Sequence, residues 1–262
     1  MGRVQTSVGS IGVIEEGGGS ATPILFLHGV GSDKSVWQPQ LAYFGRTRRA
    51  IAIDYPGYGD SQSVEGATRD DFARAALATL DALQIGRAHI CGLSLGGVVA
   101  IAMHALAPER CGSLILADTF AIHPDGQAIY DRSVAASEAM SMRDLAAARA
   151  PMLLGAAASD AIKAEVVATM GRIDPAAYRL GARAVWLADQ QDRAADIAVP
   201  TLVIVGEEDL ITPPSLSRAL VDLVGSAARF QTVAAAGHLA NLEQPAAFNE
   251  AVDQFIAKTD AN

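Results

Sequence analysis

The sequence is poor in charged residues, in aromatic residues and in cysteine. Of its 262 residues, 19% are charged and 5% are aromatic, and there are two cysteines, Cys91 and Cys111. This pair shows no metal-binding spacing and does not suggest the disulfide framework of a small secreted domain. We therefore expect two reduced, buried thiols, as is usual in a cytoplasmic protein.

Long hydrophobic runs and clusters of basic residues are also missing. No run reaches the roughly 18 consecutive apolar residues that a membrane-spanning helix needs, and the N-terminal segment lacks the apolar core of a secretory signal. The net charge is −9, and no Lys/Arg cluster is present to neutralise a phosphate backbone. These absences argue against membrane insertion and nucleic-acid binding, and they predict a cytoplasmic location.

Hydrophobic residues make up half of the chain and fall into short runs that alternate with longer segments of helical spacing. Most of the runs are continuously apolar, which is typical of strands buried on both faces of a parallel sheet. The pattern predicts an α/β protein with a mostly parallel, doubly wound sheet. The predicted strands are 23–27, 50–53, 88–91, 113–117, 201–205 and 229–233, and the predicted helices are 69–83, 95–107, 214–224 and 245–257.

Two parts of the chain fall outside that alternation. Residues 3–8 and 12–15, joined through Gly9 and Ser10, are expected to form an antiparallel hairpin at the sheet edge. Residues 119–198 are alanine-rich and helical in pattern, and such a segment is too long for a plain loop. We therefore expect 119–198 to form a helical cap over a core made of 1–118 and 199–262.

Polar residues follow three of the predicted strands, where ligands bind in open parallel sheets. The stretch Cys-Gly-Leu-Ser-Leu-Gly-Gly places Ser94 after one strand, Asp209 follows a later strand, and His238 follows the last one. This order, with Gly-x-Ser-x-Gly at a strand-to-helix turn, is typical of a serine nucleophile with an acid and a base. Gly92 and Gly96 are expected to give the clearance that the turn requires.

The same turn predicts a site for an oxyanion. The N–H of Leu95 lies at a helix start, where amides have no intrahelical partner and negative charge is favoured. A second donor is expected from Val30, in the loop His-Gly-Val-Gly after the first parallel strand.

The base and the acid each have rivals in the sequence. Besides His238 the chain has four histidines, and of these His28 is assigned to support the oxyanion loop and His123 to the cap; the remaining two are His89 and His104. The rivals of Asp209 are Glu207, Glu208 and Asp118, for which a solvated loop acid is the simpler interpretation. A phosphate-binding loop and a cluster of metal ligands at suitable spacing are both missing, so we expect neither a cofactor nor a metal.

Together these motifs resemble the α/β-hydrolase superfamily over essentially the whole chain. Residues 92–100, 200–214 and 237–248 are similar to 3-oxoadipate enol-lactonases, a resemblance that implies cofactor-free lactone opening by Ser94, His238 and Asp209. Residues 148–155 depart from the Glu-Arg-Trp-Phe-Thr segment of those lactonases, and the cap is the part expected to set substrate choice. The residues expected in the substrate pocket are His28, Trp37, His123, Arg149 and Leu239.

The sequence thus predicts a serine hydrolase that cleaves a carboxylic ester or lactone through an acyl-enzyme. The alternatives on the same three residues are a general carboxylesterase for small apolar esters, a carbon–carbon hydrolase, an acyltransferase and a perhydrolase. A further alternative is a non-enzymatic receptor for a small molecule. The expected partner is a small ester or lactone, and the expected oligomeric state is a monomer or a homodimer.

Overall fold

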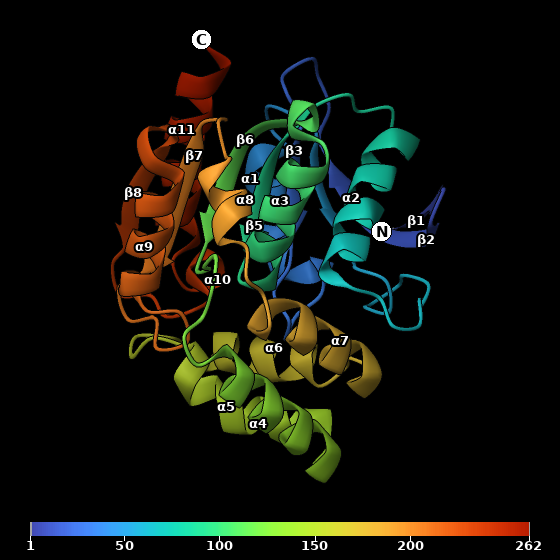
Figure 1. Ribbon diagram of the computed structural model, residues 1–262, viewed down its shortest axis with the longest axis vertical. Coiled ribbons are helices and arrows are strands. Elements are labelled where there is room, and N and C mark those ends of the chain that lie inside the picture. Colours follow the sequence, from blue (N-terminus) through green and yellow to red (C-terminus); the bar gives the residue numbers. More distant parts are fainter. Residues whose placement is uncertain (1, 262) are drawn as a thin grey trace.

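A mostly parallel β-sheet runs through the centre of the molecule, with helices on both of its faces (Figure 1). The computed structural model describes residues 2–261. Within these residues the sheet has eight strands in the order β1-β2-β4-β3-β5-β6-β7-β8. Their bounds are β1 Gly2–Thr6, β2 Gly9–Glu16, β3 Ile24–Leu27, β4 Ala50–Ile53, β5 Ala88–Leu93, β6 Cys111–Ala117, β7 Thr201–Gly206 and β8 Ala228–Val233.

The six strands β3 to β8 are parallel, as the sequence predicts. Every residue of β3, β4, β5, β6 and β7 is buried, because helices cover both faces. The exception is β8, whose residues alternate between exposed and partly buried because the strand lies at the sheet edge. The predicted α/β class with a doubly wound sheet is confirmed.

The N-terminal hairpin lies at the opposite edge, and its turn differs from the prediction. Thr6 pairs with Gly9, so the turn is formed by Ser7 and Val8, while Gly9 and Ser10 already belong to β2. Gly9, the first residue after the turn, has a φ of 117°, a backbone conformation that residues with a side chain rarely adopt. This corrects the expectation that Gly9 and Ser10 form the turn.

Helices cover the two faces of the sheet in separate sets. One face carries α2 Arg69–Ala82, α3 Leu95–Leu106, α8 Gln191–Ala195 and α9 Pro214–Val224, and the other carries α1 Gln38–Phe44, α10 Ala240–Glu243 and α11 Pro245–Asp260. Three short 3-10 helices complete the core, η1 Lys34–Trp37, η2 Pro108–Arg110 and η3 Gly225–Ala227. The two cysteines are free and buried, as expected.

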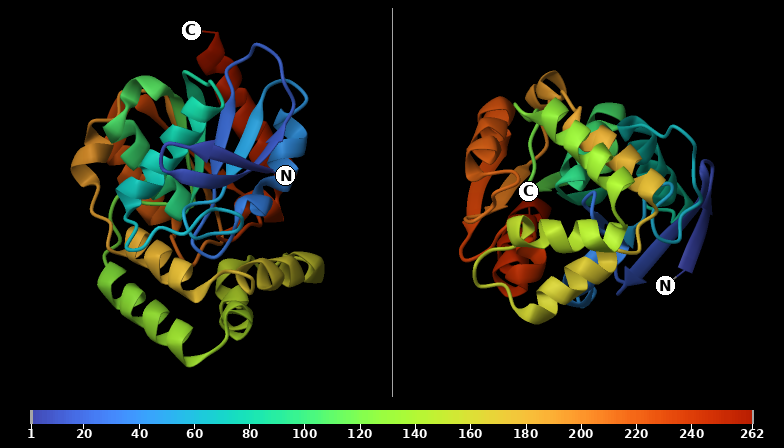
Figure 2. Two further views of the ribbon diagram at one scale, coloured as in Figure 1. Left: turned by 90° about the vertical axis from the view of Figure 1, so that its right-hand side faces the viewer. Right: turned by 90° about the horizontal axis from the view of Figure 1, so that it is seen from below.

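Four helices form a separate layer beyond the end of the sheet (Figure 2). They are α4 Gly126–Ala139, α5 Met142–Leu153, α6 Asp160–Met170 and α7 Pro175–Trp186. The chain leaves and re-enters the core at one place, where Ile122 forms an isolated β-bridge with Asp189. Helix α8 then packs against α3 and α9. We therefore propose 119–198 as the cap segment, with α8 as its return to the core.

Three of the four cap helices, α5, α6 and α7, begin at side chains that accept hydrogen bonds from the first free N–H groups. Ser141 accepts from Asp144 N–H at the start of α5, and Ser159 accepts from Ile162 N–H at the start of α6. Asp174 does the same for α7, which has proline in its first turn. These polar starts help to explain why α5, α6 and α7 begin as separate helices in the alanine-rich segment. No helix within residues 2–261 is long and apolar enough to cross a membrane.

Candidate active site

Ser94 stands in a strained turn between β5 and α3. Its φ is 54° and its ψ is −112°, in the positive-φ region that costs a non-glycine residue free energy. The surroundings hold it there, because its N–H donates to Ala117 O at 2.9 Å and its carbonyl oxygen accepts from Thr119 Oγ1 at 2.8 Å. Strain kept in place by neighbouring hydrogen bonds is typical of a functional side chain.

The glycines around Ser94 are required by close backbone approach. A Cβ on Gly96 would collide with the carbonyl group of Leu27, and a Cβ on Gly92 would collide with the carbonyl of Gly96. Helix α3 therefore starts directly against β3, with the N–H groups of its first turn at the carboxyl end of the sheet. Leu95 is the first residue of that helix, as predicted.

His238 and Asp209 form a hydrogen-bonded pair in the loops after β8 and β7. Nδ1 of His238 lies 2.9 Å from Oδ2 of Asp209, and both residues are buried. The other interactions of Asp209 also fix its orientation: Oδ1 accepts from the N–H groups of Ile211 and Thr212, at 2.8 and 2.9 Å, and Oδ2 accepts from Thr212 Oγ1 at 2.6 Å. Burial alone would raise the pKa of Asp209, but His238 and the Thr212 hydrogen bonds lower it overall. The carboxylate is thus ionised at neutral pH.

Asp118, one of the three rival acids in the sequence, lies near this pair but differs from Asp209 in its hydrogen bonds and in the direction of its pKa shift. It directly follows β6 and has a φ of 47°; its Oδ1 accepts from Gly206 N–H at 2.8 Å, and its Oδ2 has no hydrogen-bond partner within residues 2–261. Burial, and then the charge of Asp209, raise the pKa of Asp118 well above its usual value. Burial therefore favours the neutral form of Asp118, whereas the partners of Asp209 favour its charged form. The other two rival acids, Glu207 and Glu208, are exposed.

Asp118, Asp209 and His238 also offer ligand atoms within 4.8 Å of one another. A metal there would compete with the hydrogen bond between His238 Nδ1 and Asp209, and it would need the Asp118 proton to leave. The arrangement suits an acid–base pair better than a metal centre, and the absence of a metal stays a prediction.

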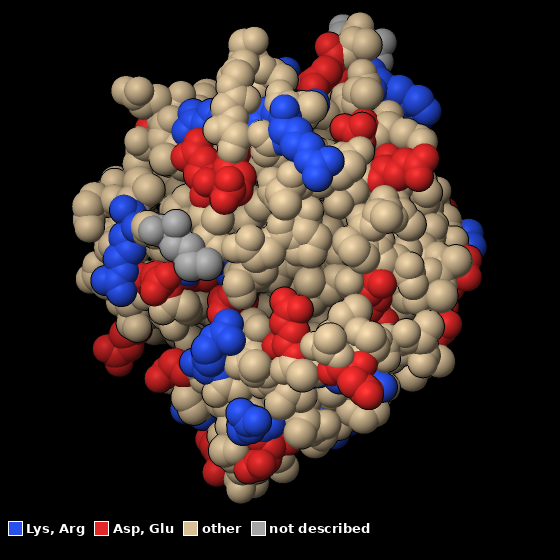
Figure 3. Space-filling view, turned by 180° about the vertical axis from the view of Figure 1, so that it is seen from behind, with Lys and Arg blue, Asp and Glu red and all other residues tan. Residues whose placement is uncertain are grey.

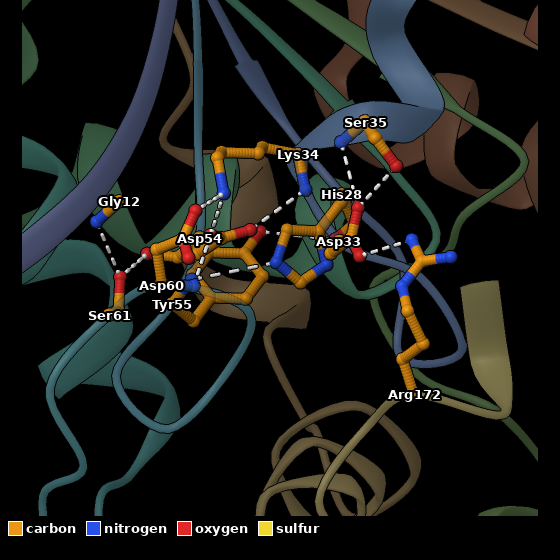
Figure 4. Close-up of polar contacts among 10 residues, drawn as sticks. All are labelled: Gly12, His28, Asp33, Lys34, Ser35, Asp54, Tyr55, Asp60, Ser61 and Arg172. Atoms are coloured by element: carbon orange, nitrogen blue, oxygen red, sulfur yellow. Dashed lines mark hydrogen bonds and ion pairs between the residues drawn. The ribbon is translucent and has the colours of Figure 1, made fainter. Parts of the chain in front are cut away.

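The loop after β3 is fixed by hydrogen bonds to the carbonyl oxygen of Gly29. His28 Nδ1 lies 2.8 Å from it, and Ser32 approaches through its N–H at 3.3 Å and its Oγ at 3.2 Å. His28 Nε2 faces Tyr55 N–H, so Nδ1 is assigned as the protonated nitrogen, and burial lowers the pKa of His28 (Figure 4). In a trans peptide the C=O and the following N–H point in opposite directions within one plane, so the contacts that anchor the Gly29 carbonyl also fix the direction of the Val30 N–H.

A buried lysine with two carboxylate partners holds the chain that follows this loop. Lys34 Nζ lies 2.5 Å from Asp54 and 2.6 Å from Asp60, while Oδ1 of Asp54 accepts from Lys34 N–H at 2.9 Å (Figure 4). Desolvation lowers the pKa of Lys34, but its two carboxylate partners raise it overall. No motif in the sequence marks Lys34 or Asp54 for this role. A signal existed in Asp54, which directly follows a buried strand.

Ser94 and His238 line one narrow cavity of about 40 Å³ under the cap. Its other lining residues are mainly apolar and come from the core loops and from α5, α6 and α7; they include Val30, Leu93, Leu153, Val166, Met170 and Leu239. Oγ of Ser94 has no hydrogen-bond partner within residues 2–261. Both groups therefore face the same small apolar space without a formed hydrogen bond between them.

A larger cavity of about 510 Å³ adjoins the first, between α4, α5 and the loop after β7. Three residues line both cavities, Arg149, Trp186 and Ile211. The outer cavity also has Arg132 and His123 on its wall. Arg149 donates to Tyr178 Oη at 2.8 Å.

The linings of the two cavities show which of the predicted pocket residues face a cavity and which do not. Arg149 and Leu239 line the inner cavity and His123 lines the outer one. His28 is fully buried behind the oxyanion loop and lines neither cavity, so its pocket assignment needs correction, and only its predicted supporting role is kept as a proposal. The pocket assignment of Trp37 needs correction, because this side chain is fully buried in the core, where it packs against Phe26 and Phe248. An aromatic residue that follows a glycine-rich loop can belong to either place, and the sequence does not separate them.

Charge is distributed evenly on the back of the molecule. Basic and acidic side chains are interspersed there over both the core and the cap (Figure 3). This mixed face gives no electrostatic footprint of the kind that binds a polyanion.

Comparisons with known proteins agree with this geometry. Residues 24–251 match the model of a family described as "Alpha/beta hydrolase family". The chain is 28% identical to 3-oxoadipate enol-lactonase 1 of Acinetobacter baylyi, over 90% of this chain and 89% of that protein. It is 30% identical to 2-hydroxymuconate semialdehyde hydrolase of Pseudomonas sp. strain CF600, over 93% and 89%. Among solved structures, the enol-lactonase of Burkholderia xenovorans LB400 superposes with a TM-score of 0.90 at 27% identity, covering 98% of this chain and all of that one.

Proposed function

This chain belongs to the α/β-hydrolase family, and on that premise we propose that it is a serine hydrolase of carboxylic esters or lactones. The observation that carries the proposal is the hydrogen bond between His238 and Asp209, because His238 lines the same cavity that Ser94 lines from its strained turn. A solvated loop acid would not explain why four hydrogen bonds converge on Asp209. The proposed small-molecule substrate fits this enclosed space.

In the proposed mechanism Ser94 Oγ attacks the carbonyl carbon of the substrate while His238 takes its proton. Asp209 holds the imidazole by Nδ1, so that Nε2 is the atom that receives the proton, and it stabilises the imidazolium that forms. When His238 returns the proton to the leaving oxygen, the bond between that oxygen and the carbonyl carbon breaks, and the acyl group stays on Ser94 Oγ as the acyl-enzyme. Water then repeats the sequence with His238 as base and releases the acid.

The developing oxyanion is stabilised by the N–H groups of Leu95 and Val30. Leu95 offers a donor at the positive end of α3, and the anchored Gly29 carbonyl orients the Val30 N–H. Removal of one such donor in other hydrolases costs about 10²–10³ in kcat. Because both donors belong to the backbone, only the side chains that orient them are open to substitution.

The substrate we favour has a small apolar part for the inner cavity and a larger part for the outer one. 3-Oxoadipate enol-lactone-like substrates are supported by the lactonase relative and by Arg149 at the junction, which is a suitable partner for a carboxylate. Small neutral esters are the alternative that the apolar lining of the inner cavity favours. We also propose a cytoplasmic location, which the two free, buried cysteines support.

Carbon–carbon bond hydrolysis is the second candidate reaction. It is favoured by the identity of 30% to a 2-hydroxymuconate semialdehyde hydrolase over nearly the whole chain. The same three residues and the same oxyanion donors would serve it, and the leaving group would then be a carbon and not an oxygen.

The proposal is tested first with Ser94→Ala on a short-chain aryl ester. We expect a loss of at least about 10³-fold in kcat/KM with an unchanged melting temperature, because the nucleophile is removed and the fold is not. Turnover at the wild-type rate in Ser94→Ala would contradict the assignment. Tight binding of a small molecule with no turnover by the wild type would favour a receptor.

A second experiment separates the substrate classes. The wild type and Ser94→Ala are compared on neutral esters of increasing acyl length, on lactones with and without a carboxylate, and on a ring-cleavage diketone. Preference for the carboxylate-bearing lactones supports the lactonase assignment. Preference for neutral esters removes it, and turnover of the diketone alone supports carbon–carbon hydrolysis.

A further inference from the structure

Three consecutive backbone N–H groups around His238 are held from two directions. The N–H groups of Gly237 and Leu239 donate to Oε1 of Glu243, at 3.0 and 3.3 Å. Between them, His238 N–H donates to the carbonyl oxygen of Leu153 at 2.9 Å. One carboxylate of the core and the last residue of cap helix α5 therefore fix the backbone of the proposed base.

Glu243 binds the cap as well as this loop. Its second oxygen, Oε2, accepts from Gly155 N–H at 2.7 Å. Only 8% of Glu243 is exposed, and burial raises its pKa although the three backbone donors act in the opposite direction. Burial of a carboxylate is costly, and the three backbone N–H donors at Glu243 offset part of that cost.

The two segments that Glu243 joins are pressed together. A Cβ on Gly237 would lie 2.6 Å from the nitrogen of Gly155 and 2.9 Å from the carbonyl oxygen of Leu153. Leu153 and Leu239, one from each segment, line the inner cavity beside Ser94. A substrate that moves the Leu153 side chain thus acts on the same backbone that carries His238.

We propose that Glu243 is a positioning residue, which couples the cap segment 153–155 to the loop 237–239 and thereby sets the reach of His238 toward Ser94. The inference rests on the proposed function, in which His238 takes the Ser94 proton. Ser94 Oγ has no hydrogen-bond partner within residues 2–261. In this proposal the hydrogen bond between Ser94 and His238 therefore forms after the substrate has entered the cavity. A misplacement of about 1 Å in such a pair can cost about 10²-fold in rate.

The test compares Glu243→Gln with the matched control Glu208→Gln. Glu208 Oε2 also accepts a cap N–H, from Ala156 at 2.7 Å, but no N–H of 237–239 donates to it. Glutamine at 243 has one acceptor oxygen where three donors converge. We expect Glu243→Gln to lower kcat on an aryl ester by about tenfold or more with KM within about twofold, and Glu208→Gln to leave both within about twofold.

A second measurement follows Ser94 directly. The rate at which a fluorophosphonate modifies Ser94, per folded molecule, depends on alignment with His238 and not on substrate release. We expect Glu243→Gln to slow it by about tenfold, and Glu243→Asp, which keeps the charge but is one methylene shorter, by about threefold or more. The aspartate variant also serves if the glutamine variant does not fold.

The outcomes separate this inference from the proposed function. A lower melting temperature with wild-type kcat and a wild-type modification rate in both Glu243 variants would mean that the residue is only structural. Equal losses in Glu208→Gln and Glu243→Gln would place the effect in cap anchoring and also overturn the inference. If the wild type itself does not react with the fluorophosphonate, then the proposed function fails.

Discussion

The floor and the roof of the cavity are built in opposite ways. On the floor, made by the loops after β3, β5, β7 and β8, hydrogen bonds converge on a few groups, above all on Asp209 and on the Gly29 carbonyl. On the roof, made by α4 to α7, Arg132 and Arg149 line the outer cavity, and neither has a carboxylate partner within residues 2–261. The floor is fixed by hydrogen bonds within the chain, whereas these two roof arginines have no carboxylate partner among residues 2–261.

This difference separates chemistry from selectivity. Groups that the chain already orients are ready for a reaction whatever the substrate, because electrostatic preorganisation needs fixed dipoles. Groups without a partner gain most from a ligand that supplies one. Substitutions on the floor should therefore change the rate for every substrate, and substitutions on the roof should change the preference among substrates.

The largest effect in this comparison is expected within the floor, between its two buried acids. Asp209→Asn should lower kcat by about 10²–10⁴-fold, because an amide cannot hold the imidazole in the correct tautomer or stabilise its charged form. Asp118→Asn should stay within about threefold of the wild type, because an amide resembles the neutral acid that burial maintains there. Steady-state kinetics on one aryl ester measures both. A loss in Asp118→Asn as large as that in Asp209→Asn would show that the acid assignment is reversed.

A smaller effect is expected where the floor acts through the backbone. His28→Ala removes the donor nearest the Gly29 carbonyl and should lower kcat by about tenfold with little change in KM, because the Val30 N–H loses its orientation. Ser32→Ala is the matched control, since the Ser32 N–H remains and only the Oγ contact is lost. Kinetics and melting temperature are measured together. Equal kcat in both variants would remove the proposed role of His28.

The floor is the part that the sequence predicts well. Gly92, Gly96 and Ser94 are readable because a strand-to-helix turn with so little clearance accepts few residue types, so the local sequence specifies the backbone. His238 and Asp209 follow from position alone, since the ends of parallel strands meet at one edge. Asp118 shows the limit of this reasoning. It also ends a strand, and only its burial and its distance from Asp209 separate a neutral acid from a charged one.

The roof and its joints to the core are harder to predict. Alanine-rich helices pack in many ways, so the pattern of 119–198 does not tell which side chains face the cavity. The contact of Gly155 with Glu243 joins residues 88 positions apart, and no motif announces it. Trp37 was misplaced for the same reason, because long-range packing against Phe248 decides its position.

The roof prediction concerns Arg149, which lines both cavities. Arg149→Ala should raise KM for a carboxylate-bearing lactone by about five- to tenfold, and change KM for a neutral ester by less than about twofold, because only the anion loses a charge-assisted partner. Arg132→Ala, at the outer cavity alone, should have a weaker effect on the same pair of substrates. A uniform loss on neutral and anionic substrates would place Arg149 with the floor and would weaken the contrast.

The smallest effect is expected where roof and floor meet at an ion pair. Arg172 Nη2 of the cap lies 3.0 Å from Asp33 Oδ2, and the Arg172 side chain is 56% exposed (Figure 4). Arg172→Ala should leave kcat unchanged and lower the free energy of unfolding by about 0–1 kcal/mol at pH 7, because water screens an exposed pair.

Burial alone would raise the pKa of Asp33, but the Ser35 hydrogen bonds, His28 and Arg172 lower it from 3.8 overall. The stability that the charged carboxylate gives is therefore complete above 3.8 and is lost as the pH falls through the lower folded pKa. The difference between the wild type and Arg172→Ala in urea unfolding should shrink over that same range, and a large loss of kcat in the variant would show that this joint, like the one at Glu243, positions the floor.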